Sequence, residues 1–302
     1  MLFIVSIVVF SIIHITPGDP AAVMLGDQAS DEDIQKVREQ LGLNEPIISQ
    51  YVHWFSNVLK GNFGFSYFMN KPVLTAIYDH LGPTLSLAVM AEIFAILFAI
   101  PLGVIAAKRK GTLTDQSIMG VSLVGISIPS FLLALFLVLI FSVQLRWLPV
   151  AGFVPISTDI VAHYKHLLLP VIALGTMQAS LIVRMTRASL LDVLSLDFIK
   201  ALRAKGVKER VVIYSHALRN AFIPIITVIG QSLGTLVAGA AVTETIFNIP
   251  GIGQLILNSV ERRDYAVIQG SILFVTFAYL IINLLIDLLY GVIDPRIRLE
   301  KK

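Results

Sequence analysis

The chain contains no cysteine and little charge. Without a thiol among its 302 residues, disulfides, thiolate catalysis and cysteine-based metal sites are excluded. Charged residues make up only 14% of the chain, against roughly 25% in a soluble domain, and hydrophobic residues make up 56%. The mean hydropathy of +0.82 agrees with this. Such a composition predicts a protein that crosses a membrane several times.

Sequence motifs for nucleotide binding and catalysis are also missing. No Gly-x-x-x-x-Gly-Lys-Ser/Thr phosphate loop occurs, so this polypeptide is not expected to hydrolyse ATP. Serine, histidine and aspartate are scattered without a catalytic arrangement. His163 and His166 have the spacing of metal ligands, but we interpret them as structural residues at a membrane boundary. We therefore expect no enzyme, no metal site and no cofactor bound by this chain.

Long apolar runs are abundant. A helix needs about 20 predominantly apolar residues to cross a bilayer, and five runs qualify or nearly so: 85–107, 118–143, 167–183, 221–243 and 266–286. A shorter run covers 2–15. It lacks the basic start and the cleavage site of a signal peptide, and it lacks the polar face of an interfacial helix. We expect it to be a first span whose cytoplasmic lead-in is missing from this start, which gives six transmembrane helices.

The distribution of basic residues predicts the orientation. The net charge is +3, and most lysines and arginines fall in three segments, 108–110, 184–219 and 296–302. Basic residues accumulate in cytoplasmic loops, so this excess does not indicate a nucleic-acid partner. The rule places both termini in the cytoplasm, which requires an even number of spans.

Residues 16–84 form a segment too long for a simple turn. Ser30 and Asp33 resemble a capping box at the start of a short helix, and Gly42 fits its C-terminal cap. Pro46 suits the start of a second amphipathic helix, which residues 61–64 end. We expect an external helical segment, either a packing cap or a contact for a delivery protein.

The cytoplasmic segment 188–220 is too regular for a flexible linker. Asp197 can cap a short helix, Gly206 permits a left-handed turn, and a second helix begins near Lys208. Val211, Val212, Tyr214 and Leu218 of this second helix are expected to point toward the fifth span. The pattern predicts a protruding helix–glycine–helix elbow. Two roles remain open on the pattern alone: a basic loop on anionic lipid, or an elbow that fits a cleft in another protein.

The sequence of this elbow is specific. Residues 198–206 read Phe-Ile-Lys-Ala-Leu-Arg-Ala-Lys-Gly, and 216–221 read His-Ala-Leu-Arg-Asn-Ala. This resembles the coupling motif of ABC importer permeases, in the variant of the oligopeptide, dipeptide and nickel permease family. Lys200 and Leu202 stand where the general motif has Glu and Ala, and Arg219 where it has Pro, as is common in the peptide branch. Further matching segments follow in order at 15–20, 41–43, 61–64, 127–131, 244–255 and 294–296.

The resemblance covers essentially the whole chain and implies an all-α integral membrane protein with the type I importer permease fold. It implies a transmembrane helix at 1–15, an extracellular helical loop at 16–84 and a core permease domain at 85–302 that holds the elbow. The implied partners are a second homologous permease subunit, two ABC ATPase subunits that hold ATP and magnesium, an extracellular solute-binding protein and membrane lipid. The implied location is the bacterial cytoplasmic (inner) membrane.

The resemblance also assigns site residues. ATPase coupling falls to Ala201, Arg203, Ala204, Lys205, Gly206, His216, Leu218 and Arg219. An extracellular gate or scoop loop would include Glu244, Pro250, Gly251 and Gly253.

Polar residues at bilayer depth are costly and point to function. Glu92, Gln178 and Gln231 are therefore candidates for the solute path, with interhelical hydrogen bonding as the alternative.

The expected function is transport of dipeptides, oligopeptides or a related solute such as glutathione or a nickel complex. One alternative is a secondary transporter driven by an ion gradient, which usually shows repeated halves and paired broken helices; no convincing repeat is visible here. Another is an intramembrane hydrolase, for which no nucleophile with an evident base is present.

Overall fold

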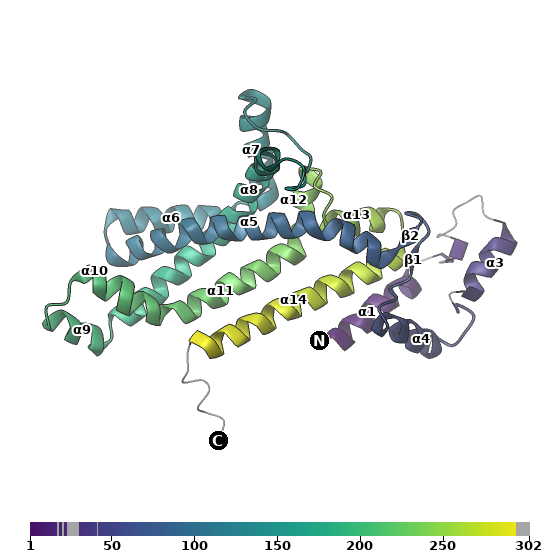
Figure 1. Cartoon of the computed structure of the whole chain (residues 1–302), viewed down its shortest axis with the longest axis horizontal. Helices are drawn as coiled ribbons and strands as arrows, with labels where there is room; N and C mark the ends of the chain where they lie inside the picture. Colours follow the sequence, from purple (N-terminus) through teal and green to yellow (C-terminus); the bar gives the residue numbers. More distant parts are fainter. Residues whose placement is uncertain (17, 20, 23–29, 41, 294–302) are drawn as a thin grey trace, which may run out of the picture. The chain divides into compact units, whose positions relative to one another are not determined.

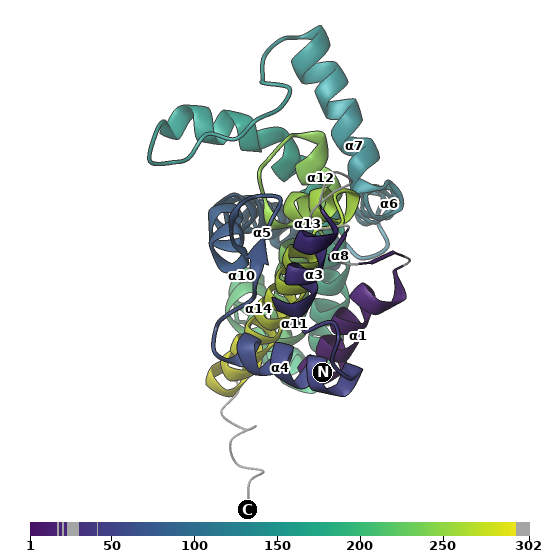
Figure 2. The same cartoon turned by 90° about the vertical axis from the view of Figure 1, so that its right-hand side faces the viewer.

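The computed structural model describes residues 1–16, 18–19, 21–22, 30–40 and 42–293, which are mostly helical (Figure 1 and Figure 2). It divides into two compact units. The first unit comprises Met1–Thr84 and Pro250–Ala278, and the second comprises Leu85–Ile249 with the residues from Tyr279 on. Several residues of the motifs quoted above lie outside the described residues: Pro17, Pro20, Leu41 and 294–302.

The first unit contains short helices and one small sheet. Strands β1 and β2 pair antiparallel, with Phe65 opposite Pro72. Val73, Ile77 and Val267 belong to its buried core. The elements are α1 (Leu2–Ile15), α3 (Asp31–Gln40), α4 (Ile47–Leu59), β1 (Phe65–Ser66), β2 (Lys71–Pro72), the start of α5 (Val73–Lys108), α13 (Ile252–Glu261) and the start of α14 (Tyr265–Ile293).

Local sequence signals explain the ends of α3 and α4. Ser30 Oγ accepts a hydrogen bond from the Asp33 backbone N–H (3.2 Å) and donates to the Asp33 carboxylate (2.6 Å). Gly42 follows α3 with φ +66, and the Leu43 N–H donates to the Arg38 carbonyl (3.0 Å). Pro46 directly precedes α4. The two helices expected within 16–84 are thus present as α3 and α4.

The second unit is organised around the long helix α8 (Ile160–Leu194), which packs against α6, α7 and α11. Small residues permit these close approaches: a Cβ added at Gly125 would lie 2.3 Å from Ser180 Oγ, and one at Gly175 would lie 2.5 Å from the Phe94 ring. The remaining elements are the rest of α5, α6 (Leu113–Ser127), α7 (Ser130–Leu137), π-helix η1 (Val138–Gln144), α9 (Asp197–Ala204), α10 (Glu209–Val211), π-helix η2 (Val212–Ala217), α11 (Leu218–Gly239), α12 (Ala241–Ile246) and the end of α14.

Within the described residues, four helices are long and apolar enough to cross a membrane. A fifth follows if α6 and the helix formed by α7 and η1 make one span. The run at 118–143 is therefore not one straight helix: it bends by 97°, and α7 leaves the direction of α6 (Figure 1). Pro129 explains the break, because it donates no hydrogen bond and holds Ile128 in an extended conformation. Helix α1, with 14 residues, is apolar but shorter.

Candidate coupling site and polar membrane residues

The elbow predicted at 188–220 is a helix–turn–helix at the tip formed by α9 and α10 (Figure 1). Gly206 has φ +76, and its N–H donates to the Arg203 carbonyl (3.0 Å), so the left-handed turn is confirmed. A Cβ at Gly206 would meet no atom within 4 Å, so the backbone conformation and not crowding requires glycine. Asp197 is the first residue of α9 rather than its cap, and it pairs with Lys200 (2.8 Å).

A buried apolar cluster anchors the elbow. Ile199 of α9 is fully buried and shares this cluster with Val212, Ile213 and Ala217 of η2 and with Leu190 of α8. The second helix passes through a π-helical segment, which is wider than an α-helix and shifts the following side chains around the axis. Val212 is buried and Leu218 half-buried, as expected, whereas Val211 and Tyr214 are exposed, so their expected inward positions are wrong. The wider turn can account for Tyr214, which lies within η2, but not for Val211, which precedes it.

An ion pair braces the turn. Arg203 Nε and Nη2 donate to the two carboxylate oxygens of Glu209, at 3.1 and 2.7 Å, across Gly206. The two side chains are 43% and 48% exposed. The hydrogen bond to Glu209 raises the pKa of Arg203 above its ordinary value, so the guanidinium stays charged. The two sides of the elbow are thereby joined by a planar, two-pronged contact.

Three of the predicted coupling residues, Ala201, Lys205 and His216, line a shallow hollow of about 280 Å³. Its lining is largely apolar, with one lysine and one histidine: Phe198, Ala201, Leu202, Lys205 and His216. Of the other predicted residues, Leu218 is half-buried and Arg203, Ala204, Gly206 and Arg219 are exposed. The elbow therefore offers an accessible, basic surface with an apolar centre.

A second ion pair was missed by the sequence analysis. Arg187, which had been counted only as a cytoplasmic basic residue, donates through Nε and Nη2 to Asp115 at 2.6 and 2.8 Å. Asp115 is only 3% exposed and also accepts from the Gly111 N–H (2.9 Å). The pair joins the start of α6 to α8. Because its partners are 72 residues apart, no local pattern could have revealed it.

The three candidates for the solute path have different surroundings. Glu92 is buried, and its Oε2 accepts a hydrogen bond from Ser232 of α11 (2.6 Å), while its Oε1 has no partner among the described residues. Gln178 of α8 is buried, whereas Gln231 is exposed. Glu92 thus makes the interhelical hydrogen bond that was the alternative interpretation, and Ser232 is a partner that the sequence did not suggest.

The residues of the predicted gate loop belong to both units. Glu244 in α12 is fully buried, and its carbonyl accepts from the Ile249 N–H (2.8 Å). Pro250, Gly251 and Gly253 belong to the first unit, where Gly251 directly precedes α13.

His163 and His166 form separate hydrogen bonds to backbone carbonyls. His163 Nδ1 donates to the Val154 carbonyl (2.7 Å), and His166 Nδ1 donates to the Ala162 carbonyl (2.8 Å). Over the described ranges, no group of three or more metal-ligating side chains occurs.

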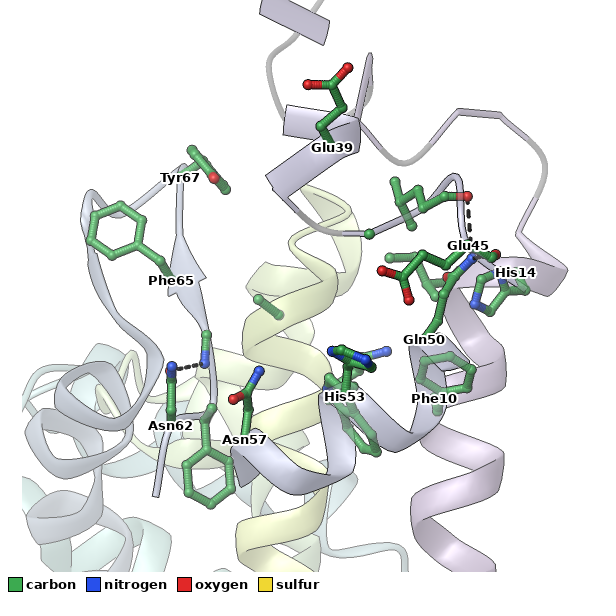
Figure 3. A pocket seen from close by; sticks show the side chains of 18 residues that line it. Phe10, His14, Glu39, Glu45, Gln50, His53, Asn57, Asn62, Phe65 and Tyr67 are labelled. Carbon is green, nitrogen blue, oxygen red and sulfur yellow. Dashed lines mark hydrogen bonds between the residues drawn. The ribbon is translucent and has the colours of Figure 1, made fainter. Parts of the chain in front are cut away.

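The first unit contains a pocket of about 350 Å³ (Figure 3). Its apolar part includes Phe10 of α1 and Trp54 of α4. Gln50, His53 and Asn57 of α4 also border it, together with Glu39 and Glu45. No motif in the sequence had pointed to this pocket.

Comparison with known proteins identifies the family. Residues 99–299 match the family of the binding-protein-dependent transport system inner membrane component, and 1–88 match the N-terminal model of such membrane components. The chain belongs to this family. It is therefore the permease subunit of an ABC importer, a multi-pass protein of the inner membrane. ATP hydrolysis in such importers is the task of a partner ATPase.

The permease has full-length relatives. It is 42% identical to the probable peptide ABC transporter permease protein y4tP of Sinorhizobium fredii, over 97% of this chain and 94% of the relative. It is also 42% identical to the glutathione transport system permease protein GsiC of Escherichia coli (strain K12), over 98% of this chain and 94% of that protein. A structure of the inward-facing MetNI methionine ABC transporter matches with a TM-score of 0.60 at 17% identity, over 73% of this chain and 97% of the matched chain, which shows a shared fold.

Proposed function

We propose that this permease forms half of the translocation path for peptides or a related small solute such as glutathione. Two relatives that are 42% identical over almost their whole length are named as a peptide permease and a glutathione permease, which supports this substrate class. In the proposed assembly, the permease pairs with a second homologous subunit, two ATPases bind below, and an extracellular binding protein delivers the solute. ATP and magnesium are held by the ATPases, and no cofactor or metal is held by this chain.

The proposed topology has six spans with both termini in the cytoplasm. The four long apolar helices, the bent pair and the short α1 supply the segments. Residues 1–15 form the first span, 16–84 an external helical segment and 85–302 the core. Concentration of lysine and arginine at 108–110 and 184–219 supports the orientation.

The observation that carries the proposal is the anchored and braced elbow. A segment that transmits force must move as one body with the helices behind it. Ile199 fixes α9 in the core of the second unit, and the Arg203–Glu209 pair joins both sides of the turn. Movement of an ATPase against α9 would then be passed to α8 and α11 rather than absorbed by the turn.

The surface of the elbow suggests how the ATPase binds. An apolar side chain of the ATPase would enter the hollow around Ala201 and His216, and acidic groups would face Lys205 and Arg219. Basic residues at such a rim steer association and fix register.

Two further sites belong to the proposed transport function. Glu92 is proposed to contribute to the path together with Gln178 and Gln231, because a carboxyl group at bilayer depth is rarely kept without a function. Glu244 with Pro250, Gly251 and Gly253 is proposed to form the external gate or scoop loop, which the position of these residues after α11 supports.

Reconstitution tests this function. We expect uptake of a dipeptide or of glutathione into vesicles only when both permeases, the ATPases, the binding protein and ATP are present. Uptake by this chain alone under a proton or sodium gradient would overturn the proposal in favour of a secondary transporter.

A further inference from the structure

Helix α4 has three distinct faces and, over 13 residues, no aspartate, glutamate, lysine or arginine. Gln50, His53 and Asn57 lie on the side that borders the pocket (Figure 3). A second side packs on α1. The third side carries Ile48, Val52 and Leu59, which are 75%, 57% and 73% exposed and recur at helical spacing. These three side chains are therefore largely uncovered by the described residues of the first unit.

The contacts of α4 fix the level at which it meets α1. Tyr51 packs edge-on against Phe10 with ring centroids 5.4 Å apart, and the hydroxyl groups of Tyr51 and Ser6 are hydrogen-bonded at 2.8 Å. Trp54 lies 5.6 Å from the same Phe10 ring. Ser6 and Phe10 lie within α1, nine and five positions before its last residue, Ile15. Helix α4 thus lies beside the apolar length of α1 and not above it.

The opposite side of α1, at the level of its contact with Tyr51, is also apolar and exposed. Ile4 and Val8 are exposed there, at 66% and 59%. In a multi-pass membrane protein such a surface faces acyl chains, because exposing apolar side chains to water is unfavourable. Since α4 shares this level, its own exposed aliphatic face borders the same medium.

We propose that α4 lies within the apolar layer of the membrane, beside α1. Ile48, Val52 and Leu59 face lipid acyl chains, and Gln50, His53 and Asn57 face the hydrated pocket. This arrangement is physically consistent because polar groups at membrane depth are tolerated where they line a water-filled cavity. Part of the segment 16–84, expected to be external as a whole, would then be a membrane element.

Lipid suits this face better than a protein partner does. A protein interface has a polar rim all around an apolar centre. The stripe of α4 has polar residues on one side only, and on its other side it meets α1, whose exposed residues Ile4 and Val8 are also apolar. The inference goes beyond the transport function but rests on the proposal that α1 is a membrane span.

Spin labelling tests the inference directly, because the chain has no native cysteine. The variants I48C, V52C and L59C probe the exposed face, and Q50C, H53C and N57C are matched controls on the side of the same helix that borders the pocket. Each labelled full-length chain is reconstituted in vesicles of phosphatidylethanolamine and phosphatidylglycerol. Collision with oxygen, which partitions into lipid, is compared with collision with a water-soluble nickel chelate.

We expect oxygen to dominate several-fold at the first three positions and the nickel chelate to dominate at the controls. Equal access of the chelate to both sets would overturn the proposal. Labels at 48, 52 and 59 that are immobile and shielded from both reagents would also overturn it, by showing a protein partner. A label at I4C separates the two proposals: oxygen access at 4 but not on α4 leaves the first span intact and rejects the inference alone.

Tryptophan fluorescence supplies a second measurement without a label. The sequence has two tryptophans, Trp54 and Trp147, and Trp54 borders the pocket. The variant V52W/W54F/W147F therefore has a single emitter, placed on the exposed face of α4. Brominated acyl chains should quench its emission. Quenching by aqueous iodide but not by brominated lipid would contradict the proposed depth.

Discussion

The second unit holds two ion pairs of the same chemistry in different surroundings. In each pair an arginine donates two hydrogen bonds to one carboxylate. The buried pair, Arg187–Asp115, joins two helices that are far apart in the sequence, and Asp115 is almost inaccessible. The exposed pair, Arg203–Glu209, joins the two sides of a single turn, and both side chains are more than 40% exposed.

The difference in burial separates their roles. Removing one partner of a buried pair typically costs about 3–5 kcal/mol, because the other charge is left without compensation. Exposed pairs are usually worth about 0.2–1 kcal/mol. The buried pair therefore holds α6 to α8 and stabilises the fold, whereas the exposed pair contributes little to stability and instead maintains the shape of the elbow.

The largest effect is expected from R187Q. This change leaves the Asp115 carboxylate without its counterion, so we expect a loss of about 3 kcal/mol, seen as a lower midpoint of thermal unfolding in detergent. The value lies at the low end for buried pairs, because Arg187 is 26% exposed and Asp115 keeps its hydrogen bond from the Gly111 N–H. D115N should cost less, because Arg187 is partly exposed and can recruit water. R184Q changes an exposed arginine on the same helix and serves as the control. Equal midpoints for R184Q and R187Q would show that the buried pair does not stabilise the fold.

A smaller effect on stability, but a clear one on transport, is expected from R203Q. Loss of the brace should cost at most about 1 kcal/mol of unfolding free energy. Solute uptake per ATP hydrolysed should fall, because the two sides of the elbow then move independently. The measurement is uptake and ATPase activity in the same vesicles. A fall in stability as large as that of R187Q would remove the distinction between the pairs.

Exchanging the two charges tests whether Arg203 and Glu209 act through each other. R203E and E209R should each impair coupling, and the double variant R203E/E209R should recover part of it, because the opposite charges again face each other across Gly206. No recovery would indicate that Arg203 and Glu209 act on the ATPase separately and not through each other.

The smallest effect is expected from salt. Screening weakens an exposed pair more than a buried one, since the Debye length falls from about 10 Å at 0.1 M to about 3 Å at 1 M. Raising the ionic strength should reduce uptake per ATP in the wild type more than in R203Q. The thermal midpoint of R203Q should change no more than that of the wild type.

Sequence reasoning succeeded where a feature depends on neighbouring residues. The positive φ of Gly206, the Ser30–Asp33 contact and the left-handed Gly42 all follow from local chemistry. The apolar runs likewise follow from composition.

Prediction from the sequence failed where contacts between distant residues, or the hydrogen-bond pattern of a helix, decide the structure. The Arg187–Asp115 and Glu92–Ser232 contacts join residues 72 and 140 positions apart. Tyr214 lies in the π-helix η2 and is exposed, although a regular helix was assumed. Pro129 explains why the helix breaks, but the angle of 97° depends on the packing of α7.

The turn at Gly206 offers the most direct test of the account. G206V places a β-branched residue at φ +76, which costs about 1–2 kcal/mol. This cost lowers the ratio of native to non-native turn conformations roughly 5- to 30-fold. G61V is the matched control, because Gly61 has φ +82 and equally free surroundings but lies outside the elbow. The measurement is solute uptake per ATP hydrolysed in the reconstituted importer. The account predicts a several-fold fall for G206V with normal membrane insertion and a wild-type ratio for G61V. A wild-type ratio for G206V would contradict it.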